Sequence, residues 1–245
     1  MEIHKKSNKI YGAPKITEIL KTEGEKISER TVGKYMKELG IKSRWVKRSF
    51  VKTTINPDFS KKLCNILNRR FNPDKPNMVW VTDITYIRTR AGFVYLNCIM
   101  DLYSRKIIAW TLSKNLETDS VITTIEKAKA KRFNNTDDLL IIHTDRGCQY
   151  TSEAWIKNTK DMCRSYSDKG EPYDNACIES FHSVIKREWL NFFEIRDYDE
   201  AYMLVFEYIE AFYNTVRIHS HCGYMSPNDY ENLYYETILL AKQAV

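Results

Sequence analysis

The sequence lacks several patterns that mark whole classes of protein. Its six cysteines are scattered without a C-x-x-C pair, which argues against a disulfide framework and against a zinc ribbon. No apolar run approaches the roughly 18 residues that a membrane-spanning helix needs. The first residues, MEIHKKSNKIYG, also lack the apolar stretch of a signal peptide. We therefore expect a cytoplasmic protein with reduced cysteines and no membrane partner.

What the chain does have is a globular composition with a basic segment. It has 245 residues, of which 43% are hydrophobic, and a net charge of +6. This length suits one large domain or two modest ones. Residues 42–52, KSRWVKRSFVK, carry five basic residues and no acid, with two aromatic residues between them. Such a segment can contact nucleic acid, through Arg44, Lys47 and Arg48, or can be a solvated linker.

The first fifty residues have the pattern of two amphipathic helices joined by a short turn. The first, APKITEILKTEG, ends at Gly24, and the second begins with Ser28 as its N-cap. Val32, Met36 and Leu39 should pack inward. This pattern fits a helix-turn-helix, and it also fits an ordinary helical hairpin. As a DNA-binding module, residues 1–50 would present the following outward side chains to the major groove: Arg30, Thr31, Lys34 and Lys37.

The middle of the chain predicts a mixed α/β domain. Three β-rich runs with short turns, MVWVTDITYIRT, GFVYLNCIMDLYS and RKIIAWTLS, predict an antiparallel meander. A helix over 117–133 and the buried strand DLLIIHTD follow, and a strand that arrives after a helix should pair in parallel. Helical patterns dominate from residue 152 onward. We therefore predict a sheet flanked by helices over 76–190, with a basic, proline-containing linker at 51–75 and a helical extension at 191–245.

Three carboxylates stand out by their context. Asp83 lies in the middle of the first strand, Asp145 follows a buried strand, and Glu179 lies on a helix expected to pack on the sheet. Each alone fits a hydrogen-bonded edge residue, a cap or a surface ion pair. Together they can meet at one edge of the sheet, where oxygen ligands suit Mg²⁺ or Mn²⁺. Two such ions about 4 Å apart can clamp the oxygens of a phosphoryl transfer. Beside Asp145, His143 and Arg146 are candidates for supporting the ligands or contacting DNA.

The helix that carries Glu179 adds a stripe of polar side chains. Lys186 follows Glu179 by two turns, roughly 10 Å along the same face. Asn175 precedes Glu179 by four residues, and His182 follows it by three, so both share that face. The stripe could present contacts to DNA, and it could equally be an ordinary polar face. Asn175, His182 and Lys186 are therefore candidate DNA contacts.

Five motifs occur in order along the chain: PNMVWVTDITYI, MDLYSRKIIAW, HTDRGCQYTSEAW, YDNACIESFHSVIKRE and FYNTVRIHSHCGYMSP. In these motifs the chain resembles the OrfB-type transposases of bacterial insertion sequences, which have a retroviral-integrase-like catalytic core. The N-terminal segment IYGAPKITEILKTEG with ISERTVGKYMKELGI is similar to that family's small helical DNA-binding module. The resemblance covers nearly the whole chain.

The resemblance implies an RNase H-like fold and a catalytic triad of two aspartates and a glutamate. By position in the motifs, the triad is Asp83, Asp145 and Glu179, binding Mg²⁺ or Mn²⁺, and Lys186 touches DNA near it. The implied reaction is hydrolysis of a phosphodiester at the end of the element, followed by attack of the freed 3′-OH on another phosphodiester. The implied partners are element and target DNA, further copies of the chain, and an upstream helix-turn-helix protein fused through frameshifting. Such a protein would be associated with the nucleoid.

The chain departs from the family pattern between the second and third acids. Asp145 and Glu179 are separated by 33 residues, two fewer than is usual in the family. The shortfall falls in IKNTKDMCRSYSDKG, which should form a helix and the next strand. An alternative function is therefore a catalytically silent regulator, from a decayed copy, that binds the element's ends. A general nuclease or junction resolvase would explain the triad but neither the N-terminal module nor the YNTVRIHSHCGYMSP tail.

Two other features have structural explanations that we favour. His219, His221 and Cys222 suggest zinc, but no second pair of ligands lies nearby in the sequence. His219 matches a family position and is expected to orient the terminal loop. Asp101 also matches a family motif, yet it lies in a turn between strands and is expected to act as a cap.

Overall fold

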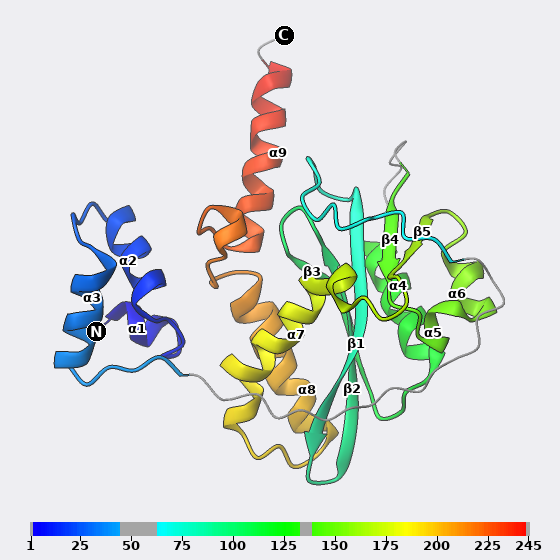
Figure 1. Cartoon of the computed structure of the whole chain (residues 1–245), viewed down its shortest axis with the longest axis horizontal. Coiled ribbons are helices and arrows are strands. Elements are labelled where there is room, and N and C mark those ends of the chain that lie inside the picture. The colour runs from blue at the N-terminus through cyan, green and yellow to red at the C-terminus, as the bar shows by residue number, and fades with distance from the viewer. Residues whose placement is uncertain (1, 45–62, 133–138, 244–245) are drawn as a thin grey trace.

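The computed structural model describes residues 2–44, 63–132 and 139–243 (Figure 1). Lys47, Arg48 and part of the predicted linker at 51–75 lie outside these residues. Among the helices of the described ranges, none is both long and apolar enough to cross a membrane.

The N-terminal module consists of α1 (Glu2–Lys6), α2 (Ala13–Thr22) and α3 (Glu29–Glu38). Ser28 caps α3 as predicted, since its hydroxyl accepts the backbone N–H of Thr31 at 3.2 Å. Val32 is buried, whereas Leu39 is 60% exposed. The expectation that Leu39 packs inward was wrong: its N–H still donates to the carbonyl of Tyr35 at 2.9 Å, so the helical path reaches it, but at this end of α3 its side chain is left open to solvent.

A five-stranded sheet forms the centre of the molecule, in the order β3-β2-β1-β4-β5. Its strands are β1 (Val79–Thr89), β2 (Gly92–Asp101), β3 (Ile107–Ser113), β4 (Ile141–Thr144) and β5 (Cys163–Tyr166). The first three pair antiparallel, which confirms the meander. β4 pairs in parallel with β1, and β5 with β4, as expected for strands that arrive after helices.

Helices cover both faces of this sheet. Along β1, Val79 and Val81 belong to the core that includes α7 (Ala176–Glu188) and α8 (Tyr198–Phe206). Trp80, between them, belongs to the opposite core with α4 (Thr118–Arg132), α5 (Cys148–Thr151) and α6 (Glu153–Asn158). Successive side chains of a strand point to opposite faces, so one strand serves two cores. The predicted mixed α/β class is confirmed, and Asp83 falls on the α7 side.

The C-terminal part is helical, as predicted, but in shorter pieces. Around Glu179 the chain forms a 3₁₀ turn (Pro172–Asn175), then α7, then a second 3₁₀ turn (Leu190–Phe192). α8 continues as a π-helical segment (Glu207–Tyr213), and a 3₁₀ turn (Ser220–Cys222) precedes α9 (Pro227–Gln243). Figure 1 shows α9 projecting away from the sheet.

The N-terminal module is joined to the rest of the chain by specific contacts. The Tyr11 hydroxyl donates to the carbonyl of Val216 at 3.3 Å and accepts the N–H of Ile218 at 2.9 Å. The Arg44 guanidinium lies over the Phe192 ring, 4.0 Å from its centroid. The module therefore packs on the segment that follows α7 and α8.

Candidate active site

Asp83 is held by β1 on the face that α7 covers. Its Oδ2 lies 3.2 Å from Nδ1 of His182, and its side chain is 19% exposed. Burying a carboxylate is unfavourable unless it has a partner. The contact with His182 supplies one, and it fixes the direction in which the Asp83 carboxylate points.

Two further contacts align α7 with β1. The amide nitrogen of Asn175 donates to the carbonyl of Thr82 at 3.1 Å. Lys186 donates from Nζ to the hydroxyl of Thr85 at 2.6 Å. The polar stripe predicted on this helix therefore faces β1 on both sides of Asp83.

Asp145 lies at the same edge of the sheet because β4 runs parallel to β1. Val81 pairs with His143 in this ladder, and two more residues along each strand bring Asp83 and Asp145 abreast. Oδ1 of Asp145 accepts the backbone N–H of Gly147 at 2.9 Å. A Cβ on Gly147 would lie 3.0 Å from the same oxygen. A glycine at this position therefore keeps the carboxylate free of a close side chain.

The electrostatics connect all three acids. The pKa of the Asp145 carboxyl is raised to about 7, first by burial, next by the charge of Asp83, and less by that of Glu179. The N–H of Gly147 opposes this rise. Asp145 nevertheless keeps an open side toward solvent. The Asp145 carboxylate is therefore packed among protein atoms on one side and open to a ligand from solution on the other. The negative charges of Asp83 and Glu179 raise its pKa further.

The donor set fits a hard divalent cation. Carboxylate oxygens are the ligands that Mg²⁺ and Mn²⁺ prefer. The pKa of Asp145 is raised mainly by burial and further by the negative charges of Asp83 and Glu179, which a bound cation would offset. However, no three His, Cys, Asp or Glu side chains of the described residues converge closely enough to form a ligand cluster. Carboxylates repel one another, and only a counter-charge draws three of them together. A donor set that suits a divalent cation is therefore compatible with carboxylates that stand apart when no cation is bound.

The predicted DNA contacts on α7 do not all fit this geometry. Asn175 is 3% exposed and His182 is 5% exposed. Because both side chains are buried against β1, they cannot reach DNA as they stand, and they instead hold the helix and Asp83 in place. Lys186 is also turned inward, with its Nζ 4.4 Å from the centroid of the Tyr86 ring.

The residues beside Asp145 support the sheet. His143 is fully buried, and its ring nitrogens lie 2.8 Å and 3.1 Å from the hydroxyls of Ser165 and Ser167. Burial lowers its pKa to about 4, so the ring is neutral near pH 7. Arg146 donates to the Ser167 carbonyl at 2.6 Å and pairs with Asp168 at 3.3 Å. The alternative that His143 contacts DNA is therefore wrong, because its side chain is fully buried.

The shortened segment after Asp145 forms a helix and a strand, as expected. It contains the end of α6 and all of β5. Just before it, Trp155 of α6 is fully buried against Tyr150 of α5, with ring centroids 5.2 Å apart. Tyr150 was not singled out from the sequence. Its hydroxyl donates to Asn97 at 3.2 Å, and burial together with the charges of Asp83 and Asp145 raises its pKa well above 10. The sequence signal for Tyr150 is its position five residues after the candidate ligand Asp145.

The outward face of α3 agrees with its helical spacing. Arg30, Lys34 and Lys37 are all exposed. Lys34 lies 3.8 Å from Glu38, a pair that is open to solvent. Arg44, by contrast, is half-buried over Phe192. DNA contacts by these residues remain predictions.

The cluster near the C-terminus is held by hydrogen bonds. Nε2 of His221 lies 2.9 Å from the carbonyl of Tyr103, and the thiol of Cys222 donates to the carbonyl of Ser104 at 3.2 Å. Nδ1 of His219 accepts the N–H of His221 at 3.2 Å. These contacts attach the terminal loop to the turn after β2, in keeping with the loop-orienting role expected of His219.

Asp101 acts as the predicted cap. Its carboxylate accepts the N–H groups of Asn77 at 2.8 Å and Tyr103 at 2.9 Å. Burial raises its pKa to about 6 although these two bonds oppose the rise. Asp101 therefore stabilises the end of β2.

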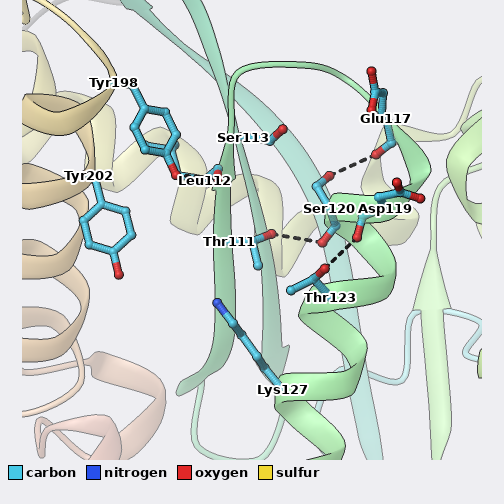
Figure 2. Close-up of a pocket in the computed structure, with 10 residues that line it drawn as sticks. All are labelled: Thr111, Leu112, Ser113, Glu117, Asp119, Ser120, Thr123, Lys127, Tyr198 and Tyr202. Carbon is cyan, nitrogen blue, oxygen red and sulfur yellow. Dashed lines mark hydrogen bonds between the residues drawn. The ribbon is translucent and has the colours of Figure 1, made fainter.

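A cavity of about 280 Å³ lies elsewhere, between edge strand β3, the start of α4 and α8. Figure 2 shows Tyr198 and Tyr202 on its α8 side and Lys127 on its α4 side. None of the residues predicted for catalysis or DNA binding lines it. This cavity is therefore separate from the carboxylates.

Comparison with known proteins relates most of the chain to one family. Integrase core domain models match residues 73–172 and 160–227, and an HTH-like domain model matches residues 1–49. The transposase for insertion sequence element IS904 of Lactococcus lactis is 37% identical over 223 residues, covering 90% of this chain and 87% of the relative. Transposase InsF for insertion sequence IS3A of Escherichia coli is 34% identical over 231 residues, covering 93% and 78%.

The fold has a counterpart among solved structures. A chain of the simian T-cell lymphotropic virus intasome, in complex with PP2A regulatory subunit B56 gamma, matches with a TM-score of 0.54 at 16% identity. The match covers 72% of this chain and 60% of that one. With the mixed sheet flanked by helices and the HTH-like module before it, this defines an integrase-type protein with an RNase H-like fold.

The sequence matches identify the family more specifically than the fold does. The chain belongs to the insertion-sequence transposases that carry an integrase core domain. This confirms the resemblance found in the five motifs.

Proposed function

We propose that this chain is a DDE transposase that cleaves DNA at the ends of its insertion sequence and joins them to target DNA. Asp83, Asp145 and Glu179 are its catalytic residues. The observation that carries the proposal is the raised pKa of Asp145, to which both other acids contribute at one edge of the sheet. A buried carboxyl whose pKa is raised toward neutrality, with other acids nearby, is typical of catalytic sites.

The same three carboxylates would hold Mg²⁺ or Mn²⁺, in a pair of ions. When bound, such ions activate the attacking oxygen and stabilise the leaving one. The chain's own contribution is to orient the acids. His182 fixes the carboxylate of Asp83, and the N–H of Gly147 fixes that of Asp145. Water and the 3′-OH are the nucleophiles, so no covalent intermediate with the protein is needed.

DNA would be bound by several parts of the chain. We propose that the module at 1–50 binds the element's end through Arg30, Lys34 and Lys37, and that Lys186 contacts DNA beside the triad after leaving Thr85. We propose that the remaining residues divide into a linker at 51–75, a catalytic core at 76–190 and a helical extension at 191–245. Recombination joins two element ends to one target, so we propose that several copies act together on DNA.

The proposal is tested with a labelled duplex that carries the element's end. Wild-type protein should give nicks or strand-transfer products that depend on Mg²⁺ or Mn²⁺, and Asp145→Asn should give none. Asp74→Asn is the control, since Asp74 is an exposed acid outside the site. The upstream helix-turn-helix protein is supplied as a fusion. If wild type and Asp145→Asn bind the duplex equally and neither changes it, the chain is a silent end-binding regulator and the catalytic proposal fails.

A further inference from the structure

A second cavity, of about 370 Å³, lies between the N-terminal module and the rest of the chain. Its walls come from α2, from α7, and from the segment around residues 213–220. The polar residues that line it are all basic or neutral, and they include Lys15, Arg105, Ser180, Arg217, His219 and Ser220. No aspartate or glutamate is among its lining residues.

This cavity and the catalytic carboxylates lie on opposite flanks of α7. Cys177, Ser180 and Val184 line the cavity. Glu179 and Lys186 are offset from them by about half a turn of the helix, at 3.6 residues per turn. The cavity is therefore distinct from the proposed active site, and an inference about it does not rest on the catalytic proposal.

The charges around the cavity are not balanced. Arg217 is paired with the buried carboxylate of Glu188, at 2.7 Å from Nε and 2.8 Å from Nη2. Arg105 contacts neutral groups, donating at 3.0 Å to the carbonyl of Phe71 and at 3.1 Å to the side-chain oxygen of Asn72. Nζ of Lys15 is buried, lies 4.9 Å from the centroid of the Tyr11 ring, and has no hydrogen-bond partner among the described residues. One carboxylate thus faces three cationic side chains.

The excess of positive charge helps to lower the pKa of two neighbouring groups, Lys15 and His219. Burial first, and then the charge of Arg217, lower the pKa of Lys15 to about 7. Burial first, and then the charges of Arg217 and Arg105, lower the pKa of His219 to about 3. His219 is therefore neutral. Because its Nδ1 accepts the N–H of His221, its proton is on Nε2, which can donate.

We propose that this cavity binds a phosphate group, with Lys15 as its principal charged partner. A buried ammonium without an acceptor is unfavourable, and rotation of the flexible Lys15 side chain from the Tyr11 ring into the cavity would give it one. Lysine, arginine, imidazole and hydroxyl groups that converge from several elements suit an anion with several acceptor oxygens. The phosphate comes either from the DNA backbone or from free phosphate. Bound there, it would fasten the N-terminal module to the core.

The test is calorimetric titration of the full chain with inorganic phosphate at about pH 6, where Lys15 is protonated. Ionic strength is held constant and divalent metals are left out. We expect wild type to bind phosphate and Lys15→Met, which keeps the apolar stem, to bind at least tenfold more weakly. Lys5→Met is the matched control, since Lys5 is exposed in the same module, and should bind as wild type does. Equal binding by wild type and Lys15→Met overturns the proposal.

A second variant guards against loss of folding in the first. Ser180 is exposed on α7 at the cavity, so Ser180→Glu should fold while its carboxylate competes for Lys15. It should also weaken phosphate binding at least tenfold, and unchanged binding in this variant contradicts the proposal.

The source of the phosphate is found with a labelled duplex in the same buffer. If DNA supplies it, inorganic phosphate lowers the DNA affinity of wild type but not of Lys15→Met. If free phosphate is the ligand, it leaves the DNA affinity of both proteins unchanged. Either result, after phosphate binding has been measured, supports the site and assigns its source.

Discussion

Replacing Asp145 with asparagine should stabilise the folded chain in the absence of divalent metal. In the folded state, burial and the charges of Asp83 and Glu179 oppose ionisation of Asp145. Asparagine has the same shape without the charge, and its amide oxygen can still accept the N–H of Gly147. The substitution thus removes a repulsion and keeps the local hydrogen bond.

The size and the pH dependence follow from the pKa. The difference between the ordinary value of 3.8 and about 7 corresponds to about 4 kcal/mol if the group were wholly buried. Because Asp145 is open to solvent on one side, screening reduces the expected gain to about 1–2 kcal/mol. Below about pH 4 the carboxyl is protonated in both the folded and the unfolded chain, so there is no gain. Between about pH 4 and 7 the unfolded chain loses the proton first, so wild type loses stability relative to the variant as the pH rises.

The assay is thermal unfolding with a chelator present, at pH 8 and at pH 4. For a chain of this size the gain corresponds to a Tm higher by about 2–8 °C at pH 8, and the difference should vanish at pH 4. Asp74→Asn, at an exposed acid, should change Tm little at either pH. Adding Mg²⁺ should then raise the Tm of wild type more than that of Asp145→Asn. A variant no more stable than wild type at pH 8, or a gain equal at both values of pH, refutes the electrostatic account.

Three further predictions concern the framework around the site. Glu188→Gln should lower the free energy of unfolding in urea by about 3–5 kcal/mol, because it leaves the buried Arg217 without its carboxylate. The control Glu200→Gln, in an exposed ion pair, should lower the free energy of unfolding by less than about 1 kcal/mol. Similar losses for the two variants would contradict this prediction. The pKa of His143 is lowered to about 4 by burial. The stabilising contribution of the neutral ring is therefore complete above about pH 6.5 and is lost as the pH falls toward 4, by up to about 3 kcal/mol. His143→Gln should reduce the dependence of the urea midpoint on acid pH, and an unchanged dependence would contradict this prediction. Trp155→Ala should lower the free energy of unfolding by about 3–5 kcal/mol, and a loss below about 1 kcal/mol would mean that α6 is not packed as described.

The order and type of the main elements could be predicted because their signals are local. Alternating apolar residues and short turns define the meander of β1, β2 and β3, and the helix before β4 predicts that it pairs in parallel. That parallel pairing brings Asp145 beside Asp83. The meeting of two of the three acids could thus be argued from the order of elements alone.

Other features depend on how elements pack, and a helical wheel does not contain that information. It places Asn175, His182 and Lys186 on one face of α7, but only the docking of α7 on β1 determines that this face is turned inward. The cavity at Lys15 depends on contacts between Tyr11 and Ile218, which are 207 residues apart. No local pattern connects residues at that distance.

The central claim is that Asp83, Asp145 and Glu179 act as one catalytic unit, and strand transfer by single and triple variants tests it most directly. The measurement is the rate at which a pre-cleaved element end is joined to target DNA in Mg²⁺, for wild type, Asp83→Asn, Asp145→Asn, Glu179→Gln and the triple variant. Groups that act as a unit have non-additive effects. We predict that each single variant loses as much activity as the triple one. A single variant that keeps activity within tenfold of wild type would contradict the account.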